Sequence, residues 1–273
     1  MLQESRDLMA EADELHRFLV TLDAEDWQRP TAFRQWTPWD VVAHLHLFDR
    51  VALAALEGPE AFAARRNELL SALSSGLPSA ELARRELGPL TPLSLLELWI
   101  RSCHELARQL GQSEPRRRIP WFGPDMGVRM FTTARLMETW AHGQEVYDLL
   151  GVARQPTDRL RHVATLGVKT FGWSFANRGL EPPGPPPHVR LQAPSGTVWE
   201  WNPANEQESI RGDALDFCWV VTQTRNVADT QLQVVGEGAR RWMEIAQCFA
   251  GAPTDPPKPG ERSGAPPAGT PRS

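Results

Sequence analysis

Cysteine, tyrosine, excess positive charge and long apolar runs are all scarce in this sequence of 273 residues. Its three cysteines are widely spaced and form no C-x-x-C pair, which favours reduced, buried thiols in a cytoplasmic protein. The net charge of −5 lacks the basic excess of nucleic-acid-binding proteins. No apolar run approaches the roughly 20 residues of a membrane span, and the N-terminal stretch is too polar for a secretion signal. We expect a cytoplasmic monomer or small homo-oligomer with neither a nucleic-acid nor a membrane partner.

Apolar residues at helical spacing run through residues 1–178. Leu8, Leu15, Leu19 and Leu22 recur at three-, four- and seven-residue intervals and would form one apolar stripe. Further helices are expected over 60–73, 92–111, 129–150 and 156–179, and a Pro- and Gly-rich loop is expected over 116–127. The sequence therefore predicts a helical bundle in this half.

One more helix of the bundle carries a clear start signal. Thr37 can cap it, Pro38 suits its first turn, and Asp40 stands where the second residue of a capping box belongs. The helix should run to Gly58, which Pro59 follows. Because the Asp40 carboxylate lies one turn before His44, it could also orient that imidazole, and the sequence leaves both roles open.

The pattern changes at residues 179–187, where five prolines predict a stiff linker. Residues 188–251 are expected to form a small α+β domain. It would hold a hairpin turning at Ser195 and Gly196, a strand followed by a helix from about Asp213, and a strand, glycine turn and helix. Residues 252–273 contain too little apolar surface to fold, so a disordered tail is expected there.

Two histidines near the start of the second helix differ in their neighbours. His44 has Leu47 and Phe48 three and four residues after it, so it projects from an apolar face. His46 has Asp49 at the same forward spacing, which predicts a more polar side. An imidazole that faces a core must be hydrogen-bonded or serve as a ligand, and for His44 alone a core hydrogen bond is the simpler interpretation.

A carboxylate and an imidazole share one face of the helix over 129–150. Glu138 and His142 are four residues apart, among apolar neighbours. Glu138 could bond His142 or pair with Arg135, three residues before it. If His44 converges on them from a facing helix, however, two imidazoles and a carboxylate form a donor set that suits Zn²⁺ and leaves an open position. His46 is the reserve ligand.

The two motifs resemble those of a known family. "WTPWDVVAHLHLFD", followed about ninety residues later by "RLMETWAHGQEV", resembles the DinB-type metal-binding bundle, and more narrowly the mycothiol-dependent maleylpyruvate isomerase family. Matching positions in the bundle are Trp36, Thr37, Asp40, Val41, His44, Glu138 and His142, and Glu145 supplies the acidic residue that commonly follows the last of them. "RGDALDFCWVVTQTR" resembles the family's C-terminal domain at Gly212 and Arg225. His46 and the tail depart from the pattern.

This resemblance implies an N-terminal DinB-like four-helix bundle followed by a small α+β domain. It also implies a divalent metal, most simply zinc, held by His44, Glu138 and His142, and a mycothiol-like low-molecular-weight thiol as cofactor or co-substrate. Arg225 would bind an acidic substrate in a pocket between the domains; the alternative is an exposed arginine at a helix C-terminus.

Three functions follow as hypotheses. The first is a thiol-dependent isomerase or S-transferase that acts on a small, acidic electrophile, because zinc stabilises a thiolate. The second is a metal-dependent hydrolase that uses zinc-bound water without a thiol. The third is a non-catalytic metal-binding protein.

Overall fold

The computed structural model describes residues 1–114 and 116–262. The chain divides into two compact units, the first Met1–Leu150 and the second beginning at Gly151. This division precedes the Pro-rich segment 179–187, where the sequence places the linker. The reason is that helix α7 (Leu160–Lys169) packs on α9 (Ala214–Val221) of the second unit. The expected fold class, a helical bundle followed by a smaller α+β part, is confirmed.

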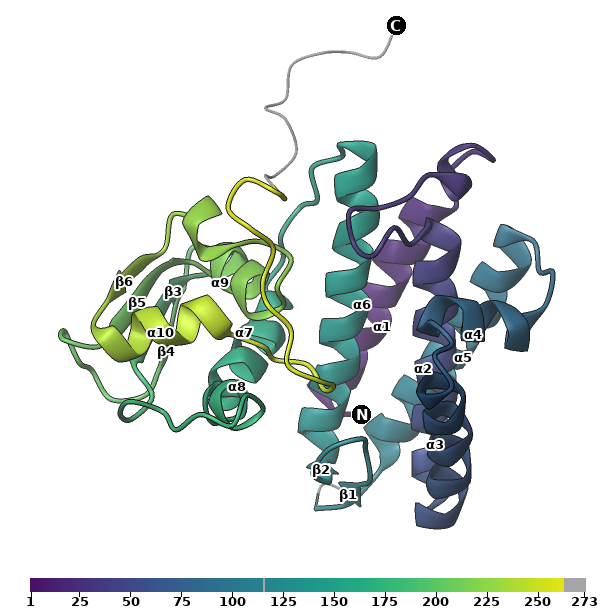
Figure 1. Ribbon diagram of the computed structural model, residues 1–273, viewed down its shortest axis with the longest axis horizontal. Helices are drawn as coiled ribbons and strands as arrows, with labels where there is room; N and C mark the ends of the chain where they lie inside the picture. The colour runs from purple at the N-terminus through teal and green to yellow at the C-terminus, as the bar shows by residue number, and fades with distance from the viewer. Residues whose placement is uncertain (115, 263–273) are drawn as a thin grey trace, which may run out of the picture. The chain divides into compact units, whose positions relative to one another are not determined.

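The first unit is built around a four-helix bundle (Figure 1). Its long helices are α1 (Gln3–Leu19), α2 (Pro38–Glu57), α5 (Pro92–Gln112) and α6 (Val128–Leu150). α1 and α2 each pack against both α5 and α6, so α2 and α6 are neighbours in the bundle. The leucine stripe is buried, as its spacing predicts: Leu8, Leu15 and Leu19 of α1 are 0% exposed, and Leu22, which follows the helix, is 9% exposed. Helices α2 and α6 therefore present side chains to one another across the core.

Helix α2 begins as the sequence predicts. The Thr37 side chain accepts from the backbone N–H of Asp40, and the Asp40 carboxylate accepts from the backbone N–H of Thr37, which completes the capping box. The guanidinium of Arg84 also donates to both Asp40 oxygens, at 2.7 and 2.9 Å. Gly58, with a φ of 154°, ends the helix. This fixed start sets the register of every later side chain on α2.

Shorter elements complete the first unit. They are η1 (Asp26–Gln28), α3 (Pro59–Ser74), α4 (Ser79–Leu87), β1 (Arg118–Ile119) and β2 (Met126–Gly127). Helices α3 and α4 pack on α2. The expected loop over 116–127 contains the small antiparallel hairpin β1–β2. Among the described helices, none combines the length and apolar composition that crossing a membrane requires.

The second unit places helices beside a mixed sheet. Its remaining elements are α8 (Phe171–Ala176), β3 (His188–Gln192), β4 (Val198–Trp201), β5 (Ser209–Asp213), η2 (Val227–Asp229), β6 (Gln233–Val235) and α10 (Glu237–Ile245). The described strands are ordered β4-β3-β5-β6, with β3 and β5 parallel and the outer pairs antiparallel. The expected glycine turn lies at Gly236, whose φ is 97°. After this turn, the backbone N–H groups of Gly238 and Ala239 donate hydrogen bonds to the Glu208 carboxylate.

Part of the expected tail is ordered. Gln223 donates to the carbonyl of Thr254 at 2.8 Å, and Asn226 donates to that of Pro257 at 2.8 Å. Asp229 accepts from the backbone N–H of Gly260 at 2.9 Å. Residues 252–262 are thus held by polar contacts, which an argument from apolar content does not detect, and the expectation of disorder is wrong for them. Residues 263–273 lie outside the described residues.

Candidate metal centre

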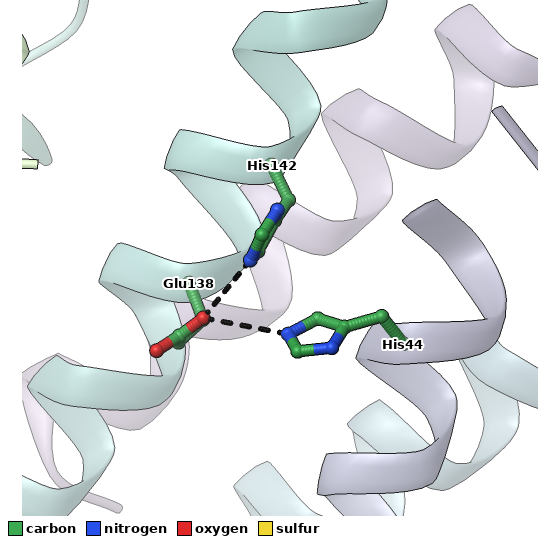
Figure 2. Close-up of side chains that lie close together, drawn as sticks. All are labelled: His44, Glu138 and His142. Carbon is green, nitrogen blue, oxygen red and sulfur yellow. Dashed lines mark ion pairs between the residues drawn. The ribbon is translucent and has the colours of Figure 1, made fainter. Parts of the chain in front are cut away.

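Three side chains from two helices of the first unit converge, as Figure 2 shows. His44 projects from α2, and Glu138 and His142 project from the same side of α6, one turn apart. Glu138 Oε2 lies 3.2 Å from His142 Nε2 and 3.6 Å from His44 Nε2. One ligand atom from each residue lies within 4.8 Å of the others, the one such group among the described residues. The sequence prediction that these three residues come together agrees with this geometry.

The environment of His44 keeps its imidazole neutral and available. Its Nε2 atom is buried and makes no hydrogen bond in the described structure. Burial, together with the nearby His142 and Arg135, lowers the pKa of His44 to about 4, against the opposing effect of Glu138. A neutral imidazole with a buried, unbonded nitrogen aimed at a carboxylate is in the protonation state that metal binding requires.

Glu138 is held as a carboxylate. Burial raises its pKa, but the contacts with His142 and His44 outweigh burial and hold the pKa well below its usual range. Arg135, the alternative partner three residues before it, instead donates to Asp49 on α2 at 3.0 Å. The pairing of Glu138 with His142 is present, and it leaves the second histidine beside the same oxygen.

Aromatic rings surround the three side chains. Trp36 stacks on the ring of His142 with centroids 5.6 Å apart and lies 5.1 Å from that of His44. Phe33 meets His142 edge-on at 5.2 Å, and Phe48 lies 4.7 Å from His44. These rings limit the access of water, which strengthens electrostatic interactions inside the site.

The loop that carries two of these rings is conformationally unusual. Arg34 and Gln35, between Phe33 and Trp36, both adopt left-handed backbone conformations, with φ of 51° and 58°. A hydrogen bond of 2.7 Å from the N–H of Thr31 to the carbonyl of Trp36 closes the loop. Left-handed conformations are costly for residues other than glycine, and such strain gathers at functional sites.

His46 and Asp40 have other partners. The Nδ1 atom of His46 lies 2.9 Å from the hydroxyl of Ser102 on α5, and the residue is only 9% exposed. The expected polar setting is therefore wrong, because α5 covers this side of α2. Burial and the nearby Arg50 lower the pKa of His46 to about 4. The Asp40 carboxylate is engaged by the helix start and Arg84, which favours the capping role over support of His44.

Arg225 belongs to the second unit and is 1% exposed. Its Nη1 donates to the carbonyl of Thr224 at 2.8 Å, and its guanidinium lies 5.0 Å from the ring centroid of Trp219. The alternative of an exposed arginine at the end of α9 is therefore wrong. Its expected role toward an acidic substrate stays a prediction.

Two features of the site escaped the sequence analysis. One is the buried pair of Asp49 and Arg135, whose members are 86 residues apart and carry no local signal. The other is a chain of ring contacts that continues from Phe48 to Trp121 and Phe122 in the loop between β1 and β2. The abundance of tryptophan, 11 residues, was the available sign of the second feature.

The donor set fits a divalent transition metal. Two imidazole nitrogens and one carboxylate oxygen are the ligand types of catalytic zinc sites, which leave a further coordination position open. The Nε2 of His44 is the observation of this structure that supports the fit: it is buried, lies 3.6 Å from Glu138 Oε2 and makes no hydrogen bond, which is otherwise unfavourable for a buried nitrogen. His44 and His142 would bind through Nε2, and Glu138 through Oε2.

The chain is similar to known proteins in sequence and in fold. Residues 8–147 match the model of the mycothiol maleylpyruvate isomerase N-terminal domain family. Uncharacterised proteins of Mycobacterium tuberculosis strains CDC 1551 / Oshkosh and ATCC 25618 / H37Rv are each 41% identical over 248 residues, which cover 90% of this chain and 95% of theirs. A crystal structure of mycothiol-dependent maleylpyruvate isomerase is similar over 80% of this chain and 87% of that one, with a TM-score of 0.51 and 15% identity. At that identity the likeness shows a common fold.

Proposed function

The chain belongs to the family of the mycothiol maleylpyruvate isomerase N-terminal domain, and from this premise we propose that it is a metal-dependent, thiol-dependent enzyme. Its co-substrate or cofactor is a low-molecular-weight thiol of the mycothiol type. The reaction is isomerisation or S-conjugation of a small, acidic electrophile. The divalent metal is zinc, held by His44, Glu138 and His142.

The convergence of His44 with Glu138 and His142 carries this proposal. Each of the three is mostly buried, with side-chain exposures of 16%, 23% and 13%. A carboxylate held ionised between two imidazoles attracts a cation, and the neutral state of His44 adds no positive charge to oppose it. A purely structural hydrogen bond needs only one histidine, and it would not leave the Nε2 of His44 buried at 3.6 Å from the carboxylate without a hydrogen bond.

A bound zinc ion would lower the pKa of a thiol in its open position and stabilise the thiolate, which is the nucleophile. The residues of the chain supply the remainder. Glu138 balances part of the ion's charge, and Trp36 and Phe33 fix the plane of His142 by ring contact. The surrounding rings restrict water, which competes with the thiol as a nucleophile.

The described cysteines support an external thiol. Cys103, Cys218 and Cys248 are all buried. Burial raises the pKa of Cys103 and Cys218 well above the usual range, which suppresses their thiolates. A small thiol from solution is therefore a better source of nucleophile than these side chains.

Metal analysis tests the ligand set. Protein stripped with a chelator and reloaded with zinc is expected to retain one ion per chain, and both His44→Ala and His142→Ala should lose it. His46→Ala is the matched control, because His46 is a buried histidine of the same helix that faces Ser102. Stoichiometric zinc in both of the first two variants would contradict the assignment.

A cobalt-substituted sample tests the thiol. Adding mycothiol should produce a sulfur-to-cobalt charge-transfer band in the near ultraviolet, and His44→Ala should abolish it. Glutathione and bacillithiol serve as comparison thiols. Metal binding with no such band for any thiol, together with turnover of esters or amides, would replace this proposal with the hydrolase. Metal binding with neither signal would favour a non-catalytic protein.

We further propose that Arg225 binds the carboxylate of the substrate. A guanidinium recognises a carboxylate through two parallel hydrogen bonds, and few other groups combine charge and direction in this way. With maleylpyruvate as the probe substrate, Arg225→Ala should raise KM and leave zinc content unchanged. Arg225→Lys keeps the charge but not the fork and should recover only part of the loss. An unchanged KM in both variants would remove Arg225 from the site.

A further inference from the structure

A buried ion pair joins the two helices that carry the candidate ligands. Arg135 reaches from α6 to α2, where its Nε and Nη2 atoms lie 3.1 and 3.0 Å from Oδ1 of Asp49. Its Nη2 also lies 3.5 Å from the carbonyl of Leu45, the residue that follows His44. The side chains of Arg135 and Asp49 are 3% and 1% exposed. The pair is thus sealed in the core beside the candidate metal centre.

A second carboxylate lies within reach of Arg135 on the same helix. Glu138 follows it by three residues, and residues three apart on a helix are neighbours. The chain forms this type of pair elsewhere: on α3, Arg65 donates to Glu68, three residues later, at 3.0 Å. Without a competing partner, the same local preference would bring Arg135 to Glu138.

Such a pair would be incompatible with metal binding by Glu138. An arginine occupies carboxylate oxygens through directed hydrogen bonds and adds a positive charge where a cation has to bind. It would also turn the carboxylate back along α6, away from His44 on the facing helix. We propose that Asp49 is a positioning residue that holds Arg135 away from Glu138, so that the Glu138 carboxylate stays directed at His44 and His142 for a divalent cation.

This role rests on the proposed metal site, and it differs from that of a simple brace. If the pair of Asp49 and Arg135 merely held α2 and α6 together, removing either partner would loosen the site. If Asp49 restrains Arg135, its loss matters only while the arginine is present. Removing both charges would then restore the site, because a buried pair can be replaced by neutral groups of similar size without loss of fold.

The experiment compares the zinc affinity of wild type, Asp49→Asn, Arg135→Met and the double variant. Affinity is measured by competition with a chromophoric chelator, and a thermal melt of each stripped protein confirms folding. Asp49→Asn should bind zinc roughly tenfold or more weakly, as expected when a group that orients a ligand is lost. Arg135→Met and the double variant should stay within roughly threefold of wild type. Arg65→Met, which removes another ion-paired arginine of the first unit, is the matched control and should bind normally.

The visible spectrum of the cobalt-substituted proteins provides a second readout. Asp49→Asn should show the altered band pattern of a site that has lost its carboxylate, and the double variant should show the wild-type pattern. If Asp49→Asn fails to fold, Arg135→Met and the double variant can still refute the proposal. A loss of zinc affinity of roughly tenfold in Arg135→Met or in the double variant would overturn the proposal. Unchanged affinity in a folded Asp49→Asn would overturn it as well.

Failure of the metal site itself would look different. Wild-type protein that retains no zinc overturns the ligand set of His44, Glu138 and His142, and with it this role of Asp49. Wild-type protein that retains zinc while Asp49→Asn does the same overturns the positioning role alone.

Discussion

Replacing His44 with glutamine in the metal-free protein should weaken the dependence of stability on pH. His44 has a folded-state pKa of about 4, below its ordinary value of 6.5. The unfolded chain therefore binds a proton more readily than the folded one. The stabilising effect of the neutral ring is present above pH 6.5 and is lost as the pH falls toward 4.

The size of the effect follows from the difference in pKa. At about 1.4 kcal/mol for each pH unit, the full difference is about 3 kcal/mol, and about 2 kcal/mol of it is lost between pH 7 and pH 5. Glu138 does not contribute in this window, because its pKa is lowered and its ionisation lies at more acidic pH. The ionisation of Glu138 therefore does not overlap the window between pH 5 and pH 7, and the comparison of variants with wild type assigns the change to the substituted histidine.

His46 provides the matched comparison, since burial also lowers its pKa to about 4. Urea unfolding of chelator-treated wild type, His44→Gln and His46→Gln at pH 7 and pH 5 should show that each variant loses about 2 kcal/mol of the wild-type change. Only His44→Gln should also lose zinc. An unaltered pH dependence in His44→Gln would refute the conclusion that this imidazole is buried and neutral.

Two further substitutions separate the fold from the site. Asp40→Asn should lower the unfolding free energy by about 1–2 kcal/mol, because it weakens the cap of α2 and the pair with Arg84, and titration should show unchanged zinc affinity. A clear loss of affinity would instead assign Asp40 a role in orienting His44. Gly167→Ala would bring a Cβ to 2.8 Å from a methyl carbon of Val221, so a cost of about 1–3 kcal/mol in the second unit is expected by urea unfolding. An unfolding free energy identical to that of wild type would show that α7 and α9 can separate without cost.

Local signals explain what the sequence predicted well. The start of α2 depends on Thr37 and Asp40, and the shared face on α6 depends on Glu138 and His142. Each pair lies within about one helical turn, so the sequence is sufficient to predict both features. Periodicity could place His44 only on an apolar face, so its convergence with Glu138 and His142 was one alternative from the residues, and the resemblance favoured it.

Contacts between distant segments explain what the sequence missed. His46 is buried because α5 brings Ser102 against it, and nothing in the neighbourhood of His46 predicts this. The sequence offered Glu138 as a partner for Arg135, but Arg135 pairs with Asp49, which lies on another helix. Residues 252–262 are ordered by hydrogen bonds to Gln223, Asn226 and Asp229, which composition does not encode.

The division of the chain after Leu150 has a consequence for inheritance. The matched family segment, residues 8–147, lies within the first compact unit, and that unit contains all three candidate ligands. A gene that recombines near this boundary would transmit the ligand set intact while exchanging everything that follows. Selection can therefore change the second half without altering the three candidate ligands. Proteins that share the first segment but differ after it would record such exchanges.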